Sequence, residues 1–187
     1  ESQGIHTLVL TGDTDILQLV SPKVNVILQQ RQGEHLLYDE KRIRERYGGL
    51  TPQQLIHLKA LRGDPSDNIP GIPGIGEKTA ILLLQTFGSI ENIFDNLDKI
   101  PDRQKALLEE NRHLADQALG LIPIVRNVPI SLNIEQCRWG QYSRDDVVAF
   151  LRELEFNSLI NGVAPGKFDS TPLNASPSET EQKVQYE

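Results

Sequence analysis

The sequence predicts an α/β fold in which a fragment of parallel sheet is followed by an all-helical region. Near the start of the 187-residue chain, two short apolar runs rich in β-branched residues flank one helical segment, as in a strand–helix–strand unit. From Tyr38 onward the pattern becomes helical. After about Val163 the residues are mostly polar, with too few large apolar groups to offset the entropy of ordering them. The predicted regions are residues 1–48, residues 49–163 and a disordered interdomain linker over residues 164–187.

The first region contains the predicted sheet. Thr7 to Leu10 is expected to form a buried strand that ends in a loop, Asp15 to Val20 a short helix, and Val24 to Leu28 a second strand. Ligands of parallel sheets bind at the carboxyl ends of the strands. Asp13 and Asp15 follow the first strand directly, so they are candidate site residues.

The second region begins with a helix that has Thr51 as its N-cap and Pro52 as its first residue, and that ends near Leu61. A later helix stops at Gly88 and is expected to bury one face. That face consists of Ala80, Leu83, Leu84 and Phe87. Further helices are expected over residues 90–96, 102–111 and 114–121.

Near the end of the second region, Ser143 is expected to cap an amphipathic helix. Asp145 and Asp146 suit the positive end of this helix. Its apolar face is predicted to belong to the core rather than to a cofactor site. The face consists of Val147, Phe150, Leu151 and Leu154.

The net charge of −7 argues at first against a nucleic-acid partner, because phosphates attract lysine and arginine. Most of the acid excess, however, lies in two short aspartate motifs and in residues 166–187. The rest of the chain carries a net charge of −1, which is compatible with a local basic surface.

Composition excludes several other classes of protein. No apolar run approaches the roughly 20 residues that a membrane span needs. The single Cys137 forms no internal disulfide, and the four histidines show no paired spacing, so neither a disulfide scaffold nor a zinc site is predicted. A reducing, cytoplasmic compartment is expected. Because the chain contains no methionine, it is expected to be a piece of a longer protein.

The strongest motif is Gly71-Ile-Pro-Gly-Ile-Gly-Glu-Lys-Thr-Ala80, which lies between two predicted helices. Its glycines let the backbone turn tightly and bring successive N–H groups against a phosphate, and Ile75 is expected to fill the core between the helices. The pattern predicts a helix-hairpin-helix that grips a nucleic-acid backbone without reading its sequence. The alternative is a plain glycine-rich turn; the spacing does not match a nucleotide-binding P-loop. The predicted DNA-binding residues are Gly71, Gly74, Ile75, Gly76, Lys78 and Thr79.

Two aspartate doublets, Asp13 with Asp15 and Asp64 with Asp67, are candidate metal ligands. Carboxylate oxygens are the ligands that Mg²⁺ or Mn²⁺ prefers, and two such ions support phosphodiester cleavage. Taken alone, each doublet is equally well explained as a helix cap or a turn. The second doublet immediately precedes the hairpin, which favours metal binding. Carboxylates of the two doublets are then expected within roughly 10 Å of each other.

A locally basic region, interspersed with acids, has two interpretations. It either adds phosphate contacts or, as is more common for such runs, forms a solvated helix face. Its basic residues are Lys41, Arg42, Arg44, Arg46, Lys59 and Arg62.

Three segments resemble the 5′ nuclease domain of bacterial DNA polymerase I. They are Thr11-Gly-Asp-Thr-Asp-Ile-Leu-Gln-Leu19, Ala60-Leu-Arg-Gly-Asp-Pro-Ser-Asp-Asn-Ile-Pro-Gly-Ile-Pro-Gly-Ile-Gly-Glu-Lys-Thr-Ala80 and Phe150-Leu-Arg-Glu-Leu-Glu-Phe-Asn-Ser-Leu159. The resemblance extends to about Val163, and its central motif is highly specific. It implies that residues 1–48 are the C-terminal part of a PIN-like α/β domain and that a helix-hairpin-helix (H3TH) region follows.

The resemblance also implies an activity and a set of ligands. The activity is 5′-flap endonuclease and 5′-3′ exonuclease cleavage with two divalent ions, Mg²⁺ or Mn²⁺, in DNA replication and repair. Asp13, Asp15, Asp64 and Asp67 match metal ligands of the family. Gly74, Gly76 and Lys78 match its duplex-binding hairpin, where a potassium ion also sits. The implied partners are duplex DNA with nicks or 5′ flaps and a following polymerase domain, in the bacterial cytoplasm and away from membranes.

The sequence also departs from the family's pattern. The first strand with its metal-binding aspartate, the helical arch and a further acidic cluster are expected to lie before Glu1. No residue is therefore assigned as catalytic, and the chain alone is expected to bind duplex DNA without cutting a 5′ flap. The alternatives are a stand-alone 5′ nuclease and a non-catalytic helix-hairpin-helix module, and metal binding distinguishes the module from the nucleases.

Overall fold

The computed structural model describes residues 3–29, 34–140 and 142–164. The chain divides into two compact units, residues 1–127 and 128–187. The mixture of small sheets and many helices confirms the predicted α/β class. The predicted boundary after residue 48 stays a prediction, and nearly all of the predicted linker lies outside the described residues. No helix in the described ranges is long and apolar enough to cross a membrane.

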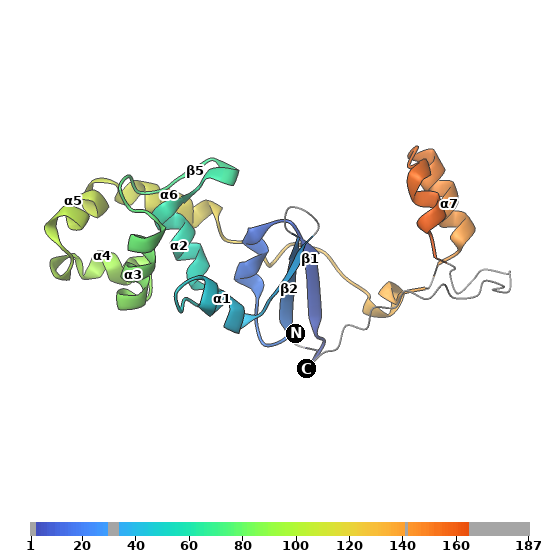
Figure 1. The fold of residues 1–187 in the computed structure, drawn as a ribbon, viewed down its shortest axis with the longest axis horizontal. Coiled ribbons are helices and arrows are strands. Elements are labelled where there is room, and N and C mark those ends of the chain that lie inside the picture. The colour runs from blue at the N-terminus through green and yellow to red at the C-terminus, as the bar shows by residue number, and fades with distance from the viewer. Residues whose placement is uncertain (1–2, 30–33, 141, 165–187) are drawn as a thin grey trace. The chain divides into compact units, whose positions relative to one another are not determined.

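The larger sheet has three strands in the order β1–β2–β3. β1 (Thr7–Thr11) and β2 (Val24–Gln29) are parallel and are connected by the 3-10 helix η1 (Thr14–Leu19), as predicted (Figure 1). β3 (His35–Tyr38) is antiparallel to β2, so the sheet is mixed rather than purely parallel. The sequence did not predict β3 because His-Leu-Leu-Tyr lacks the alternation of apolar and polar residues that marks a strand.

Among the described residues of the first unit, one face of this sheet is covered more fully than the other. Val26, Leu28 and Tyr38 share that face and are buried. On the opposite face, Leu8 and Leu10 of β1 are 58% and 65% exposed, so the expectation that this strand is buried is wrong. The difference follows from the strand period of two, which sends successive side chains to opposite faces.

Six α-helices of the first unit follow the sheet along the described chain (Figure 1). Two short strands, β4 (Gly63–Asp64) and β5 (Ile69–Pro70), and the 3-10 segments η3 (Pro65–Asp67) and η4 (Leu97–Lys99) lie among them. The predicted helices between residues 51 and 121 are confirmed to within a few residues. The helices are α1 (Glu40–Arg46), α2 (Gln54–Arg62), α3 (Glu77–Phe87), α4 (Ile90–Asp95), α5 (Asp102–Glu110) and α6 (Arg112–Leu121).

Helix α2 begins at Gln54, two residues after the predicted Pro52. Thr51 still contributes to its start, because the Thr51 hydroxyl accepts a hydrogen bond from the Gln54 N–H (3.4 Å). In return, the Gln54 side-chain oxygen accepts one from the Thr51 N–H (2.9 Å). This reciprocal pair resembles a capping box, with an extra turn between the cap and the regular helix.

Helix α2 is the centre of the helical region, since it packs against both α3 and α6. Gln18 of η1 joins the sheet to this region: its side-chain nitrogen donates to the Ile122 carbonyl (3.2 Å), and its oxygen accepts from the Ile124 N–H (3.0 Å). These bonds fix η1, which carries Asp15, relative to the helices.

The second unit contains η5 (Ile134–Cys137), α7 (Arg144–Glu153) and η6 (Asn157–Gly162). Ser143 caps α7 by accepting from the Asp146 N–H (3.4 Å), as predicted. The predicted core face of α7 is wrong in part: Phe150 is 58% and Leu154 42% exposed, whereas the neighbouring Val148 is buried. Helical spacing identifies an apolar face, but it does not predict which side chains of that face pack against another element.

Candidate metal centre and nucleic-acid interface

Asp64 and Asp67 are positioned by a tight turn after α2. Gly63 ends α2 with a φ of +86°, and Asp64 then caps the short η3 by accepting a hydrogen bond from the Ser66 N–H (3.1 Å). Asn68 closes the turn in the left-handed region, with a φ of +56°. Asparagine tolerates this conformation better than most residues. The turn buries Asp64 and leaves Asp67 exposed.

Asp15 is positioned by the loop that follows β1. Asp13 is the N-cap of η1, and its Oδ1 accepts a hydrogen bond from the Asp15 N–H (2.8 Å). Asp15 therefore lies in the first turn of η1 with its side chain half-buried, whereas Asp13 is exposed.

The structure brings three of the four predicted carboxylates together. One oxygen each from Asp15, Asp64 and Asp67 lie within 4.8 Å of one another, well inside the expected 10 Å. Asp13 is not a member of this group. Asp13 and Asp64 both cap 3-10 helices, as the capping interpretation expects. Asp64 also belongs to the carboxylate group, so capping and clustering occur together at this residue. We call Asp15, Asp64 and Asp67 the carboxylate cluster.

Lys59 is the cation of the carboxylate cluster, a role that sequence reasoning missed. Its buried ammonium donates to Asp64 Oδ2 (2.6 Å) and forms an ion pair with Asp15 Oδ1. Lys59 is therefore not a free phosphate contact, which corrects that interpretation for this member of the basic region. The available signal was its place among buried leucines of α2, because a lysine is rarely buried without a charged partner.

Burial alone would raise the pKa of Asp64, but hydrogen bonds from Lys59 and Ser66 outweigh it and hold that pKa below its usual value. Asp64 is therefore ionised at neutral pH. Asp15 Oδ1 is buried and lies against the Lys59 ammonium. Carboxylate oxygens are the ligands that a hard divalent cation prefers, and the cluster supplies three of them.

The hairpin is built around a β-turn over residues 72–75. Pro73 and Gly74 occupy its two central positions, Gly74 has a φ of +83°, and the Ile75 N–H donates to the Ile72 carbonyl (3.0 Å). Proline followed by a glycine of positive φ is the signature of a type II turn. Ile75 is buried, as predicted.

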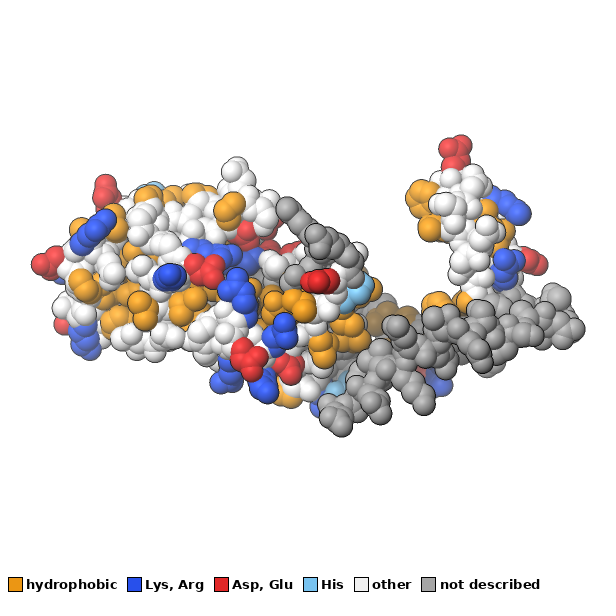
Figure 2. Space-filling model, in the orientation of Figure 1, with side chains coloured by type: hydrophobic (Ala, Val, Ile, Leu, Met, Phe, Trp, Pro, Cys, Tyr) orange, Lys and Arg blue, Asp and Glu red, His pale blue; other side chains and the backbone are white. Residues whose placement is uncertain are grey.

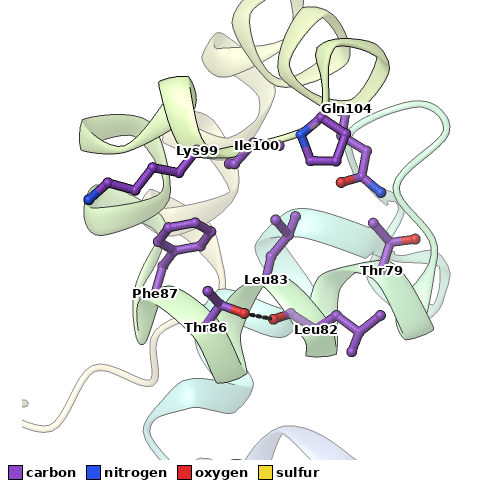
Figure 3. Close-up of a pocket in the computed structure, with 9 residues that line it drawn as sticks. Thr79, Leu82, Leu83, Thr86, Phe87, Lys99, Ile100 and Gln104 are labelled. Atoms are coloured by element: carbon purple, nitrogen blue, oxygen red, sulfur yellow. Dashed lines mark hydrogen bonds between the residues drawn. The ribbon is translucent and has the colours of Figure 1, made fainter.

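The remaining hairpin residues divide by exposure. Gly76 is the N-cap of α3, nothing lies within 4 Å of where its Cβ would be, and Lys78 is exposed. Thr79 is half-buried and lines a hollow between α3 and the start of α5, on the same side as Gln104 (Figure 3). Gly71 has a packing reason for being glycine, since a Cβ there would lie 2.1 Å from the Arg62 carbonyl carbon.

The rest of the basic region divides in two. Lys41 of α1 is exposed and pairs weakly with Glu45 (3.9 Å), which is the solvated helix face that such runs usually form. Arg46 and Arg62 instead converge on Glu77 at the start of α3. Figure 2 shows Lys and Arg side chains beside Asp and Glu side chains over the part of the first unit where α1 and α2 lie.

Comparison with known proteins places this arrangement in a family. Residues 50–145 match the family model described as 5′-3′ exonuclease, C-terminal SAM fold. DNA polymerase I of Chloroflexus aurantiacus is 39% identical over 95% of this chain and 21% of its own length. The chain belongs to the 5′-3′ exonuclease family. The resemblance to the 5′ nuclease domain of bacterial DNA polymerase I is confirmed, and the chain spans about a fifth of the length of the curated relatives it matches.

Solved structures agree on the fold. A mutant of the T5 5′-exonuclease is 26% identical with a TM-score of 0.53, over 63% of this chain and 47% of its own. A T5 5′-exonuclease with bound divalent metal ions (zinc) is 23% identical with a TM-score of 0.54, over 84% of this chain and 53% of its own. Both likenesses support a 5′ nuclease fold for the described residues.

Proposed function

We propose that this chain is the part of a 5′-3′ exonuclease and 5′-flap endonuclease that holds duplex DNA beside a divalent-metal centre. The observation that carries the proposal is the carboxylate cluster: Asp15 from η1 and two aspartates from the turn after α2 meet within 4.8 Å. That turn lies a few residues before the hairpin. Cleavage of a phosphodiester at a branch requires metal ligands together with contacts that hold the DNA backbone.

The metals of the proposal are two Mg²⁺ or Mn²⁺ ions. Asp15, Asp64 and Asp67 are the proposed ligands, and the exposed Asp13, hydrogen-bonded to Asp15, is the candidate ligand of the second ion. When bound, such ions activate a water and stabilise the departing oxygen. The T5 enzyme binds zinc, which supports a divalent-metal site. Without metal, Lys59 pairs with both Asp15 and Asp64 and so offsets part of the repulsion between these carboxylates.

The proposed partner is duplex DNA with nicks or 5′ flaps. Gly74, Gly76 and Lys78 would hold the backbone through exposed N–H groups at the start of α3 and through the lysine charge, with a potassium ion as a further expected ligand of the turn. Gly71, Ile75 and Thr79 would support this grip through packing. A polymerase domain in the same protein is proposed from the DNA polymerase I relatives.

A second candidate function is a binding module without metal. The observation that favours it is that Asp13 and Asp64 both cap 3-10 helices while Lys59 already pairs with Asp15 and Asp64. Under this alternative the hairpin still binds DNA, but the carboxylates only order the loops.

Titration with Mn²⁺, followed by calorimetry, separates the two functions. The wild-type chain is expected to bind Mn²⁺, and Asp67→Asn is expected to weaken binding about tenfold or more, since it removes an exposed ligand without disturbing the buried ion pair. The matched control is Asp98→Asn, which removes an exposed acid outside the cluster. Equal affinities for the wild type and both variants would favour the binding module.

A flap-cleavage assay tests the enzymatic half of the proposal. The chain alone is expected to bind duplex DNA weakly and to leave a 5′ flap uncut in excess Mn²⁺, because three clustered carboxylates leave one of two ions underbound. Cleavage that vanishes in Asp67→Asn would show that the residues present suffice, and the expected inactivity would be wrong.

A further inference from the structure

A cationic pocket lies beside the carboxylate cluster in the first unit. It is a cavity of about 200 Å³ lined by residues of η1, of the end of α1 and of α2. Its polar lining consists of Thr14, Arg46, Tyr47, Lys59 and Arg62. Lys59 belongs to both sites, because it lines the pocket and contacts Asp15 and Asp64. Neither the metal proposal nor the hairpin proposal uses this pocket.

The two arginines of the pocket keep a positive charge after their shared ion pair is counted. The Lys59 ammonium contacts two carboxylates, Asp15 and Asp64, so this end of the pocket has one negative charge in excess. Arg46 and Arg62 each donate one terminal N–H to the single carboxylate of Glu77 (3.3 Å for Arg46). Two guanidinium groups therefore share one negative charge.

The arginines also keep unused hydrogen-bond donors. Each guanidinium has several N–H groups and directs one nitrogen at Glu77. The Arg62 Nε is buried and has no hydrogen-bond partner among the described residues, an arrangement that usually costs free energy unless a ligand satisfies it. Arg46 is held by stacking, with its guanidinium 5.0 Å from the centre of the Tyr47 ring.

We propose that this pocket binds one phosphate group of the DNA backbone that the hairpin holds. Paired guanidinium groups match the geometry of phosphate oxygens, and the Thr14 hydroxyl is a further donor. The position fits, because Glu77 directly precedes Lys78 of the hairpin and Thr14 lies between Asp13 and Asp15. Glu77 holds the two arginines when DNA is not bound and competes with the phosphate for them. This inference rests on the proposed function and adds a contact between its two sites.

Binding of the chain to duplex DNA as a function of salt tests the pocket. Arg62→Gln is expected to weaken binding for unrelated sequences and to lower the salt slope by about 0.9, the value for one lost phosphate contact. Arg46→Gln, whose side chain is 56% exposed, gives the same test if Arg62→Gln fails to fold. Arg44→Gln is the matched control, an exposed arginine of α1 outside the pocket lining, and is expected to change the slope less.

Glu77→Gln distinguishes a phosphate pocket from a purely structural ion pair. If the arginines bind phosphate, releasing them from Glu77 strengthens DNA binding, and the gain shrinks in the Arg62→Gln background because the two residues are coupled. If the arginines only anchor α3, Glu77→Gln and Arg62→Gln both lower the melting temperature and both weaken binding, which would overturn the inference.

Two further results separate this inference from its neighbours. The first is the salt slope of DNA binding in the hairpin variant Lys78→Ala. If Lys78→Ala lowers this slope while Arg46→Gln and Arg62→Gln change it no more than Arg44→Gln does, the pocket does not bind a DNA phosphate. The proposed function would still stand. Inorganic phosphate provides the second arm. If it raises the melting temperature of the wild type but not of Arg62→Gln, while the DNA salt slope is the same for both, the pocket takes free phosphate and the assignment to DNA is wrong.

Discussion

Asp15 reaches the carboxylate cluster from the loop after β1, whereas Asp64 and Asp67 reach it from the turn after α2. The hairpin next to it draws all its residues from positions 71–79. The cluster is charged and held by one buried lysine, while the hairpin is held by glycine geometry and two buried isoleucines, Ile72 and Ile75. One site therefore depends on the folded chain as a whole and the other mainly on local backbone conformation, and their responses to mutation should differ.

The largest effect on stability is expected from removing Lys59, the cation of the carboxylate cluster. Lys59→Met leaves Asp15 and Asp64 close together without a counter-charge and is expected to lower the free energy of unfolding by about 3–5 kcal/mol, as for other broken buried ion pairs. Chemical denaturation measures this. Lys41→Met, which removes an exposed lysine, is the control and should stay within about 0.5 kcal/mol of the wild type.

Divalent metal sharpens the same experiment. If the carboxylates bind metal, Mn²⁺ should raise the melting temperature of Lys59→Met more than that of the wild type, because the ion replaces the missing positive charge. A Lys59→Met chain as stable as the wild type without metal would contradict the view that the cluster needs an internal cation.

A smaller effect is expected from glycine substitutions at the hairpin. Gly71→Ala places a Cβ 2.1 Å from the Arg62 carbonyl carbon and 2.2 Å from the Gly63 nitrogen, so it should lower the free energy of unfolding by about 1–3 kcal/mol. Gly76→Ala is the matched control: nothing lies within 4 Å of the added Cβ and φ is −84°, so the loss should be limited to a weaker N-cap, less than about 1 kcal/mol. Equal losses of stability in the two variants would show that the close backbone contact at Gly71 is not what requires glycine there.

Lys78→Ala should leave stability unchanged and affect binding alone. The side chain is exposed, so its loss is expected to lower the salt slope of duplex binding by about 0.9 and to weaken binding similarly for unrelated sequences. Fluorescence anisotropy at several salt concentrations measures both quantities. A loss confined to one DNA sequence would mean that the hairpin reads bases.

The smallest effect is a pH dependence that belongs to the cluster and not to the hairpin. Because the pKa of Asp64 in the folded chain lies below its usual value of 3.8, its contribution to stability is complete above that value. The contribution is lost as the pH falls through the lower, folded-state pKa. Unfolding free energies measured from neutral to acidic pH should therefore fall less steeply for Asp64→Asn than for the wild type. Parallel curves would contradict the pKa shift.

Local patterns in the sequence determined the hairpin and the helices around it. Pro73 with Gly74 specifies its turn, and Gly88 ends α3, because both depend on φ preferences of single residues. The strands β1 and β2 and the Ser143 cap of α7 also follow from neighbouring residues. These features need no knowledge of where the rest of the chain goes.

Contacts between distant segments were decided by the tertiary structure alone. Sequence spacing grouped Asp13 with Asp15, but the fold brings only Asp15 to Asp64 and Asp67, and Asp13 caps η1. Three further features also depended on which surfaces meet in the folded chain. They are the pairing of Lys59 with the carboxylate cluster, the antiparallel β3 and the exposed side chain of Phe150 in α7. The physical reason is that burial and charge pairing depend on which surfaces meet in three dimensions, whereas turns and caps depend on the few residues that form them.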